Sequence, residues 1–162
     1  MKKFLMIAIF TAALASPALS ADYATIHLQI DVAKPVDVVW NRIGNYCDIK
    51  DWLGMTCEIT AGHGDVGSTR HLTGGPTGPL DEIMVSKTAH SYGYTQPATT
   101  ILYHGELSAE AVDATHSRLF YTLLYDQEPL KTPEAQAANR KMRTERFQGA
   151  LAKMKEIAEA KP

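Results

Sequence analysis

Cysteine, basic charge and long apolar runs are all scarce in this sequence. Its 162 residues include only 2 Cys, and 16 Lys and Arg are outnumbered by 18 Asp and Glu. A nucleic-acid-binding surface needs clustered Lys and Arg, and none occurs, so we expect no nucleic acid partner. No apolar run reaches the roughly 20 residues of a membrane-spanning helix, so we expect no membrane span. The length and the 45% apolar content fit one globular domain.

Residues 1–20 have the pattern of a secretory signal peptide. Two lysines open the chain, an apolar run follows over residues 4–15, and small residues precede a cleavage site after Ser20 or Ala21. Cleavage leaves a single domain over residues 21–162 and lowers the formal net charge from −2 to −4, because both lysines are removed. We therefore predict a periplasmic or secreted protein.

Export changes how the two cysteines are interpreted. In an oxidising compartment a lone pair such as Cys47 and Cys57 usually forms a disulfide. Two cysteines cannot supply a four-ligand zinc site, and the C-x-x-C spacing of a redox motif is missing. We predict a Cys47–Cys57 disulfide, with two separate buried thiols as the alternative.

Alternating apolar and polar residues predict strands along much of the chain. The alternation is strict over residues 25–33, where Ile26, Leu28, Ile30 and Val32 share one face. Connections between the strands are too short for parallel crossovers, so the strands should be antiparallel. The further strand-like segments are residues 57–61, 67–72, 80–88, 91–96, 101–111 and 117–126.

Three helices complete the pattern. The first begins near Pro35 and ends at Gly44, and a short helical turn follows over residues 47–52. A long helix starts at Thr132, and its apolar stripe consists of Phe147, Ala150, Leu151, Met154, Ile157 and Ala158. The sheet has one face to bury and the helix one stripe, so a curved sheet wrapped around the long helix satisfies both. The predicted class is α+β.

A set of residues occurs along the chain in a recognisable order: Val39-Trp40, Trp52, Cys57, Gly62, Gly67-Ser68-Thr69-Arg70, Asp81-Glu82, Tyr94 and Tyr103-His104-Gly105. With these residues and this order of strands and helices, the sequence resembles a known superfamily, the START/Bet v 1-like or SRPBCC helix-grip domains. It looks closest to the bacterial branch labelled polyketide cyclase/dehydrase. The resemblance implies a curved seven-stranded antiparallel sheet around a long C-terminal helix, with two short helices after the first strand and a cavity for a hydrophobic small molecule. It implies no single activity, because one fold serves several functions.

The glycine- and proline-rich segment 73–79 predicts a loop between two strands. A symmetric hairpin centred on Pro76 sets Arg70 opposite Glu82, because each lies six residues from the centre. If both side chains point inward, the pair could hold the polar end of a ligand, make Glu82 a candidate catalytic base, or serve only as a structural ion pair. The loop could gate the cavity, or it could be an ordinary mobile loop.

Tyrosine is the most frequent aromatic residue, with seven against four Phe and two Trp. Shared strand faces make several of them candidates for the cavity wall, where a ring offers apolar area and a hydroxyl offers a hydrogen bond. Ordinary half-buried core tyrosines are the alternative. The candidate ligand-binding residues are Arg70, Glu82, Tyr92, Tyr94, Tyr103, Tyr121, Tyr125 and, on the long helix, Arg143.

Motifs for metal, phosphate or nucleophilic chemistry are missing. The histidines show no H-x-H or HExxH spacing, the glycines after residue 61 lack the Lys of a phosphate loop, and no G-x-S-x-G occurs. We expect no metal and no cofactor. The predicted function is an exported protein that binds a hydrophobic or aromatic small molecule between sheet and helix. The alternatives are a cyclase-type acid–base enzyme using Glu82, Arg70 and a Tyr, and a periplasmic accessory protein, with a protein partner, for an oxidation system.

Overall fold

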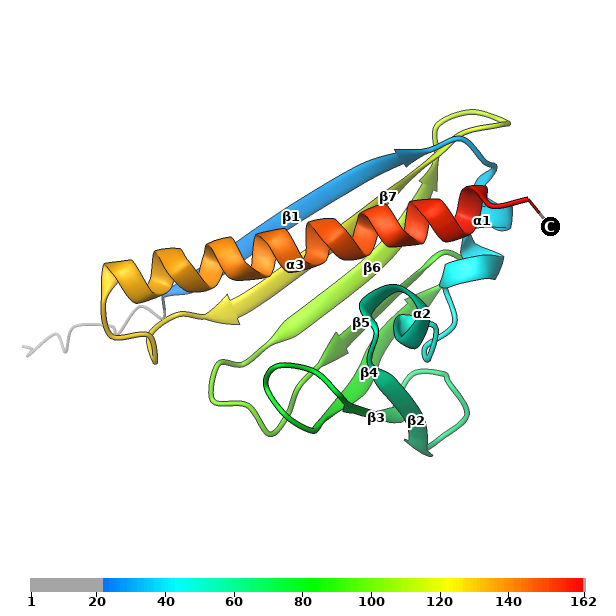
Figure 1. The fold of residues 1–162 in the computed structure, drawn as a ribbon. Helices are drawn as coiled ribbons and strands as arrows, with labels where there is room; N and C mark the ends of the chain where they lie inside the picture. Colours follow the sequence, from blue (N-terminus) through cyan, green and yellow to red (C-terminus); the bar gives the residue numbers. More distant parts are fainter. Residues whose placement is uncertain (1–21, 162) are drawn as a thin grey trace, which may run out of the picture.

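The computed structural model describes residues 22–161, so the predicted signal peptide lies outside the described residues (Figure 1). Seven strands and three helices follow one another in the predicted order. Their bounds are β1 Tyr23–Val32, α1 Val36–Ile43, α2 Ile49–Leu53, β2 Thr56–Ala61, β3 Thr69–Thr73, β4 Leu80–Thr88, β5 Ser91–Thr95, β6 His104–Ala111, β7 Ser117–Asp126 and α3 Pro133–Glu159.

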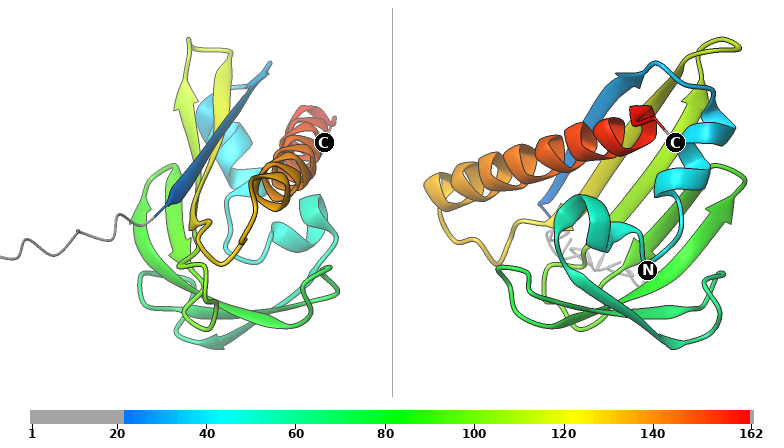
Figure 2. Two further views of the ribbon diagram at one scale, coloured as in Figure 1. Left: turned by 90° about the vertical axis from the view of Figure 1, so that its left-hand side faces the viewer. Right: turned by 45° about the vertical axis from the view of Figure 1, so that its right-hand side comes forward.

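The strands form one antiparallel sheet in the order β1-β7-β6-β5-β4-β3-β2. The sheet bends so that β2 and β3 turn under the molecule, and α3 lies along its concave side (Figure 2). The α+β helix-grip prediction is confirmed. Because β1 and β2 occupy opposite edges, the segment between them crosses one end of the concave face, and α1 and α2 close that end.

The predicted alternation sets the inward face of β1. Ala24, Ile26 and Val32 are buried, whereas Thr25 and His27 on the other face are exposed. All ten residues of β1 pair with β7, from Tyr23 opposite Asp126 to Val32 opposite Ser117.

The strand expected over residues 101–111 is shorter than predicted. β6 begins at His104, because Leu102 has a φ of 45° and turns the chain away from the extended conformation. The segment before β6 instead bonds outside the ladder, where the Ile101 carbonyl accepts from the Asp126 amide at 2.7 Å and the Tyr103 carbonyl accepts from the Gln96 amide at 3.0 Å.

Gly44 follows α1 as predicted, but for a different reason. Its φ is −94°, so it is not the left-handed C-terminal glycine that the sequence suggested. A Cβ on Gly44 would lie 2.5 Å from the indole ring of Trp40. The glycine is therefore required by the side chain that folds over it.

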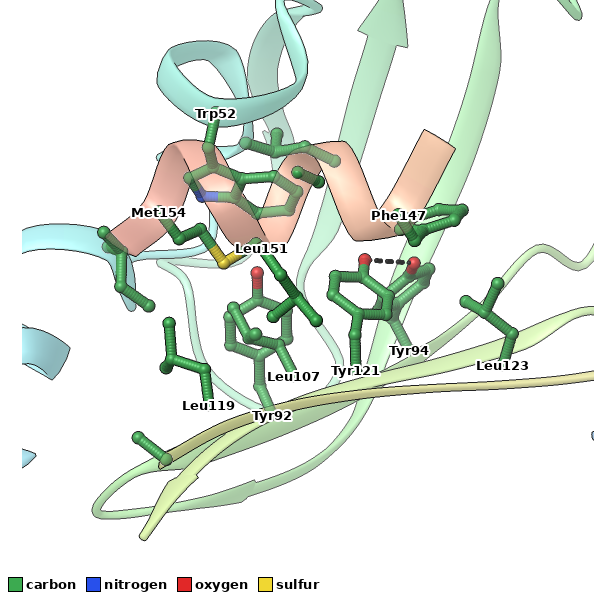
Figure 3. Close-up of a cluster of buried hydrophobic side chains, with 14 of the residues drawn as sticks. Trp52, Tyr92, Tyr94, Leu107, Leu119, Tyr121, Leu123, Phe147, Leu151 and Met154 are labelled. Carbon is green, nitrogen blue, oxygen red and sulfur yellow. Dashed lines mark hydrogen bonds between the residues drawn. The ribbon is translucent and has the colours of Figure 1, made fainter. Parts of the chain in front are cut away.

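The stripe predicted on α3 is confirmed. Thr132 caps the helix by accepting a hydrogen bond from the Ala135 amide at 3.2 Å. Phe147, Leu151 and Met154 then point down onto the sheet, where they meet side chains that rise from β5, β6 and β7 (Figure 3). Ile157 is only half-buried, at the margin of this core.

Cys47 and Cys57 form a disulfide, which confirms the prediction and removes the alternative of separate thiols. The bond joins the α1–α2 connection to β2, the strand at one edge of the sheet. Between residues 22 and 161, no helix has the combined length and apolarity needed to cross a membrane.

Candidate functional site

A cavity of about 640 Å³ lies between the concave face of the sheet and the middle of α3. Its floor comes from β3, β4 and β5, and its sides come from α2, the β3–β4 loop (residues 74–79) and the β5–β6 connection (residues 96–103). The exposed residues Ala98 and Met142 stand at its rim, so the cavity opens on this side. Apolar side chains cover most of the wall: Ile49, Leu53, Met55, Leu72, Leu80, Ile101 and Phe147.

Arg70 and Glu82 are directly opposite each other on β3 and β4, as the hairpin symmetry predicted. The Glu82 Oε2 atom accepts from Arg70 Nη2 at 2.6 Å and from Arg70 Nε at 2.8 Å. Both side chains are almost completely withdrawn from solvent. Burial is the largest single influence on the pKa of the Arg70 guanidinium and lowers it, but the Glu82 carboxylate together with the surrounding tyrosines raises that pKa above its ordinary value.

Aromatic rings enclose Arg70 on the remaining sides. Its guanidinium carbon lies 4.1 Å from the ring centre of Tyr46, 4.9 Å from Tyr94 and 5.7 Å from Tyr92. Arg70 Nη1 also donates to the main-chain carbonyl of Tyr46. Arg70 therefore sits behind the cavity wall, and of the predicted ion pair only Glu82 reaches the cavity.

The second oxygen of Glu82 is also engaged. Its Oε1 atom accepts from the side-chain amide of Gln96 at 2.8 Å. The Tyr46 hydroxyl donates to the main-chain carbonyl of Glu82 at 3.1 Å, so strand β4 is held to the α1–α2 connection at this point. Glu82 can act on a ligand only through a lone pair left over from these bonds, or after Gln96 moves away.

Four of the candidate tyrosines form two pairs. Tyr94 and Tyr121 share a hydrogen bond of 2.8 Å between their hydroxyls (Figure 3), and Tyr103 stacks on Tyr125 with ring centres 6.5 Å apart. Burial raises the pKa of all four phenols. The phenols therefore stay neutral at physiological pH and can donate hydrogen bonds.

Gly105 on β6 makes room for this arrangement. A Cβ at that position would lie 2.3 Å from the Tyr94 ring, which packs directly over the glycine. Tyr94 pairs with Gly105 across the β5–β6 ladder, so its ring occupies the space that a side chain at Gly105 would need.

Arg143 and Arg146 bring positive charge to the cavity from α3. The Arg143 guanidinium lies 4.6 Å from the ring centre of Tyr125 and 5.1 Å from that of Tyr103, and its Nε donates to Asn139 Oδ1 at 2.8 Å. Both arginine side chains are only half-buried.

The predicted site residues thus divide into two sets. Glu82, Tyr94, Tyr103 and Arg143 line the cavity, whereas Arg70, Tyr92, Tyr121 and Tyr125 lie behind its wall. A ligand contact remains a prediction for all eight. Sequence reasoning missed Tyr46, Gln96 and Arg146. Arg146 could have been found, because it lies three residues after Arg143 and one before the stripe residue Phe147.

The β3–β4 loop, for which the sequence left a gate and an ordinary mobile loop as alternatives, contributes Pro76, Thr77 and Pro79 to the cavity wall. Gating itself remains a prediction. Among residues 22–161, no group of three or more His, Cys, Asp or Glu side chains could hold a metal ion.

Comparison with solved structures gives the same fold at low sequence identity. The aromatase/cyclase Zhui from Streptomyces sp. R1128 matches with a TM-score of 0.69 at 18% identity, over 85% of this chain and 94% of that one. Norcoclaurine synthase from Thalictrum flavum matches with a TM-score of 0.68 at 16% identity, over 91% and 100%. Protein XoxI from Bacillus cereus matches with a TM-score of 0.68 at 17% identity, over 82% and 94%.

A comparison with curated protein sequences gave no match. The family model described as polyketide cyclase/dehydrase and lipid transport matches residues 23–159, from the start of β1 to the end of α3. This chain is therefore a member of the polyketide cyclase/dehydrase and lipid transport family, within the SRPBCC helix-grip superfamily.

Proposed function

We propose that this protein is exported and binds a hydrophobic or aromatic small molecule in the cavity between the sheet and α3. The observation that carries the proposal is the cavity itself: about 640 Å³, with a mostly apolar wall and a few polar groups that converge on it. Small-molecule sites commonly have this size and composition. The Cys47–Cys57 disulfide is compatible with export, because such bonds persist in oxidising compartments.

The interactions that Glu82 and Arg70 already make within the protein favour ligand binding over catalysis. Both carboxylate oxygens of Glu82 already accept hydrogen bonds, and Arg70 is enclosed by tyrosines. Glu82, which reaches the cavity, is thus fixed in place: it can accept a hydrogen bond from a ligand with a remaining lone pair, but its engaged oxygens are poorly placed to take up a proton.

The neutral fluorescent probe N-phenyl-1-naphthylamine tests the proposal. It should bind the purified mature protein saturably with one site. Ile101 lines the cavity, so Ile101→Trp should fill part of it and weaken probe binding about tenfold. Val112 is exposed in the β6–β7 turn, far from the cavity wall, so Val112→Trp is the matched control and should change binding less than about twofold. Equal effects of the two substitutions, or no saturable binding, would refute the proposal.

A cyclase-type enzyme is the second candidate, and one observation favours it. Glu82, Tyr94 and Tyr103 face the same cavity, so a carboxylate and two neutral phenols could meet one substrate as acid–base groups. Turnover of an aromatic polyketide analogue that is lost in Glu82→Gln, while N-phenyl-1-naphthylamine still binds, would establish catalysis. An accessory role in an oxidation system remains a prediction from the sequence.

A further inference from the structure

We infer that the natural ligand is an amphipathic anion, whose negatively charged group lies between Arg143 and Arg146 while its apolar body fills the cavity. This inference rests on the proposed function and adds the chemical class of the ligand. It places the polar end of the ligand on α3, away from the Arg70–Glu82 pair, which was one of the alternatives that the sequence offered for it.

Arg143 keeps most of its hydrogen-bonding capacity free. A guanidinium carries five N–H donors, and in residues 22–161 only Nε of Arg143 donates, to Asn139 Oδ1. Its guanidinium carbon lies over the rings of Tyr103 and Tyr125. These contacts hold the guanidinium beside the rings and use none of its Nη hydrogens.

Arg146 is even less engaged. Its Nη2 atom lies 3.4 Å from the sulfur of Met55, and a thioether is a weak acceptor that supplies no negative charge. A Cβ built on Gly75 would lie 3.9 Å from the same nitrogen, so Arg146 reaches from α3 across to the β3–β4 loop. Its guanidinium therefore stands where the helix and the loop meet.

The acidic residues around the cavity are already matched to other groups. Glu82 accepts from Arg70 and Gln96, and the exposed Asp81 shares a hydrogen bond of 2.7 Å with His71. Across the described part of the chain, neither Arg143 nor Arg146 forms a salt bridge. Arg143 and Arg146 thus face the cavity without an acidic side chain of the described residues in salt-bridge contact.

The spacing of the two arginines suits one anion. Side chains three residues apart on a helix lie on the same face, about 5–6 Å apart at Cβ. Arg143 and Arg146 both line the cavity, and their long side chains can reach one carboxylate, sulfonate or phosphate that enters between them. Charge-assisted hydrogen bonds of this kind are the strong ones. The apolar floor below them requires the rest of the ligand to be hydrophobic.

Matched naphthalene probes separate the charge from the apolar body. 2-Naphthoate and its neutral amide, 2-naphthamide, share a ring system and differ in the charge of one group. We expect calorimetric titration of the mature protein to show 2-naphthoate binding about tenfold more tightly than 2-naphthamide. Naphthalene-2-sulfonate and 2-naphthyl phosphate, compared at equal ionic strength, then show which anion fits best.

Variants locate the effect. In Arg143→Gln/Arg146→Gln the preference for 2-naphthoate should fall below about twofold, while 2-naphthamide keeps its wild-type affinity. The control is Lys141→Gln, which also removes a positive charge from α3, but on the exposed face where Lys141 approaches Glu145 at 3.8 Å. This control should keep the preference.

Each outcome has a distinct meaning. Equal affinity of the wild-type protein for 2-naphthoate and 2-naphthamide overturns the inference and leaves the proposed binding function standing. The inference is also overturned if the double variant keeps the preference or if Lys141→Gln abolishes it. If N-phenyl-1-naphthylamine binds but neither naphthalene probe does, the inference is overturned and the proposed function stands. If none of the three probes binds, the proposed function fails and the inference fails with it.

Discussion

Two regions of this molecule use arginine in opposite ways. Arg70 is fully buried, with a carboxylate, a main-chain carbonyl and three tyrosine rings around its guanidinium. Arg143 and Arg146 are half-buried on α3, and in the described residues they have one side-chain amide oxygen and one thioether as polar partners. The protein itself supplies the partners of the Arg70 guanidinium, whereas most N–H donors of Arg143 and Arg146 have no partner in the described residues and can bind another molecule. Burial of a charge, by itself, therefore does not mark a binding site here.

The strongest test of the buried region is to remove one partner of the ion pair. Glu82→Ala leaves Arg70 buried and uncompensated, so we expect the free energy of unfolding to fall by about 3–5 kcal/mol. Arg70→Met/Glu82→Leu removes both desolvated charges and should recover much of that loss. Urea denaturation followed by circular dichroism measures both. A double variant as unstable as the single one would show that the pair's hydrogen bonds, rather than the uncompensated charge, dominate.

The next test compares the two halves of α3. Leu151 is fully buried against the sheet, so Leu151→Ala should lower the free energy of unfolding by about 2–5 kcal/mol. Met142 is 45% exposed at the cavity rim, so Met142→Ala should cost less than about 0.5 kcal/mol. Thermal or urea unfolding gives both values. Similar losses would mean that the cavity end of the helix is packed as tightly as the other end.

The disulfide is next to the surroundings of Arg70 in the chain, because Cys47 follows Tyr46, whose main-chain carbonyl accepts a hydrogen bond from Arg70. Cys47→Ala/Cys57→Ala should lower the free energy of unfolding by about 2–3 kcal/mol on the chain-entropy model. Thiol titration of the denatured, unreduced mature protein should find no free thiol, and two titratable thiols would contradict the assignment.

The smallest effect is expected at the cavity. Arg143→Gln/Arg146→Gln removes half-exposed cation–π contacts and no salt bridge, so the free energy of unfolding should change by less than about 1 kcal/mol. The same urea experiment measures it. A loss as large as that of Glu82→Ala would place these arginines in the structural framework and end the contrast between the two regions.

Local patterns sufficed for most of the fold. Strict alternation located β1, a lone cysteine pair after a predicted signal peptide indicated the disulfide, and loop symmetry set Arg70 opposite Glu82. The start of β6 was predicted too early, because the positive φ at Leu102 occurs without the glycine or asparagine that usually indicates such a turn in a sequence. Strand alternation says which face a residue occupies.

Alternation does not say how deep a residue lies on that face. Arg70 and Glu82 share the inward face, yet only Glu82 reaches the cavity, because the α1–α2 connection brings Tyr46 over Arg70. Arg146 gains its role from the distant β3–β4 loop and Met55. These placements arise from tertiary packing between segments far apart in the sequence.

The pairing of β1 with β7 has a consequence for the order in which the chain folds. β1 is the first strand of the domain, but its hydrogen-bonding partner comes last, and every pair in the ladder joins residues from distant parts of the chain. Contacts of such long range are slow to form, because a large loop must close before they are made. A chain still lacking residues 117–126 has no partner for β1, so the sheet can be completed only after nearly the whole domain has been synthesised and, on the proposed export route, delivered across the membrane.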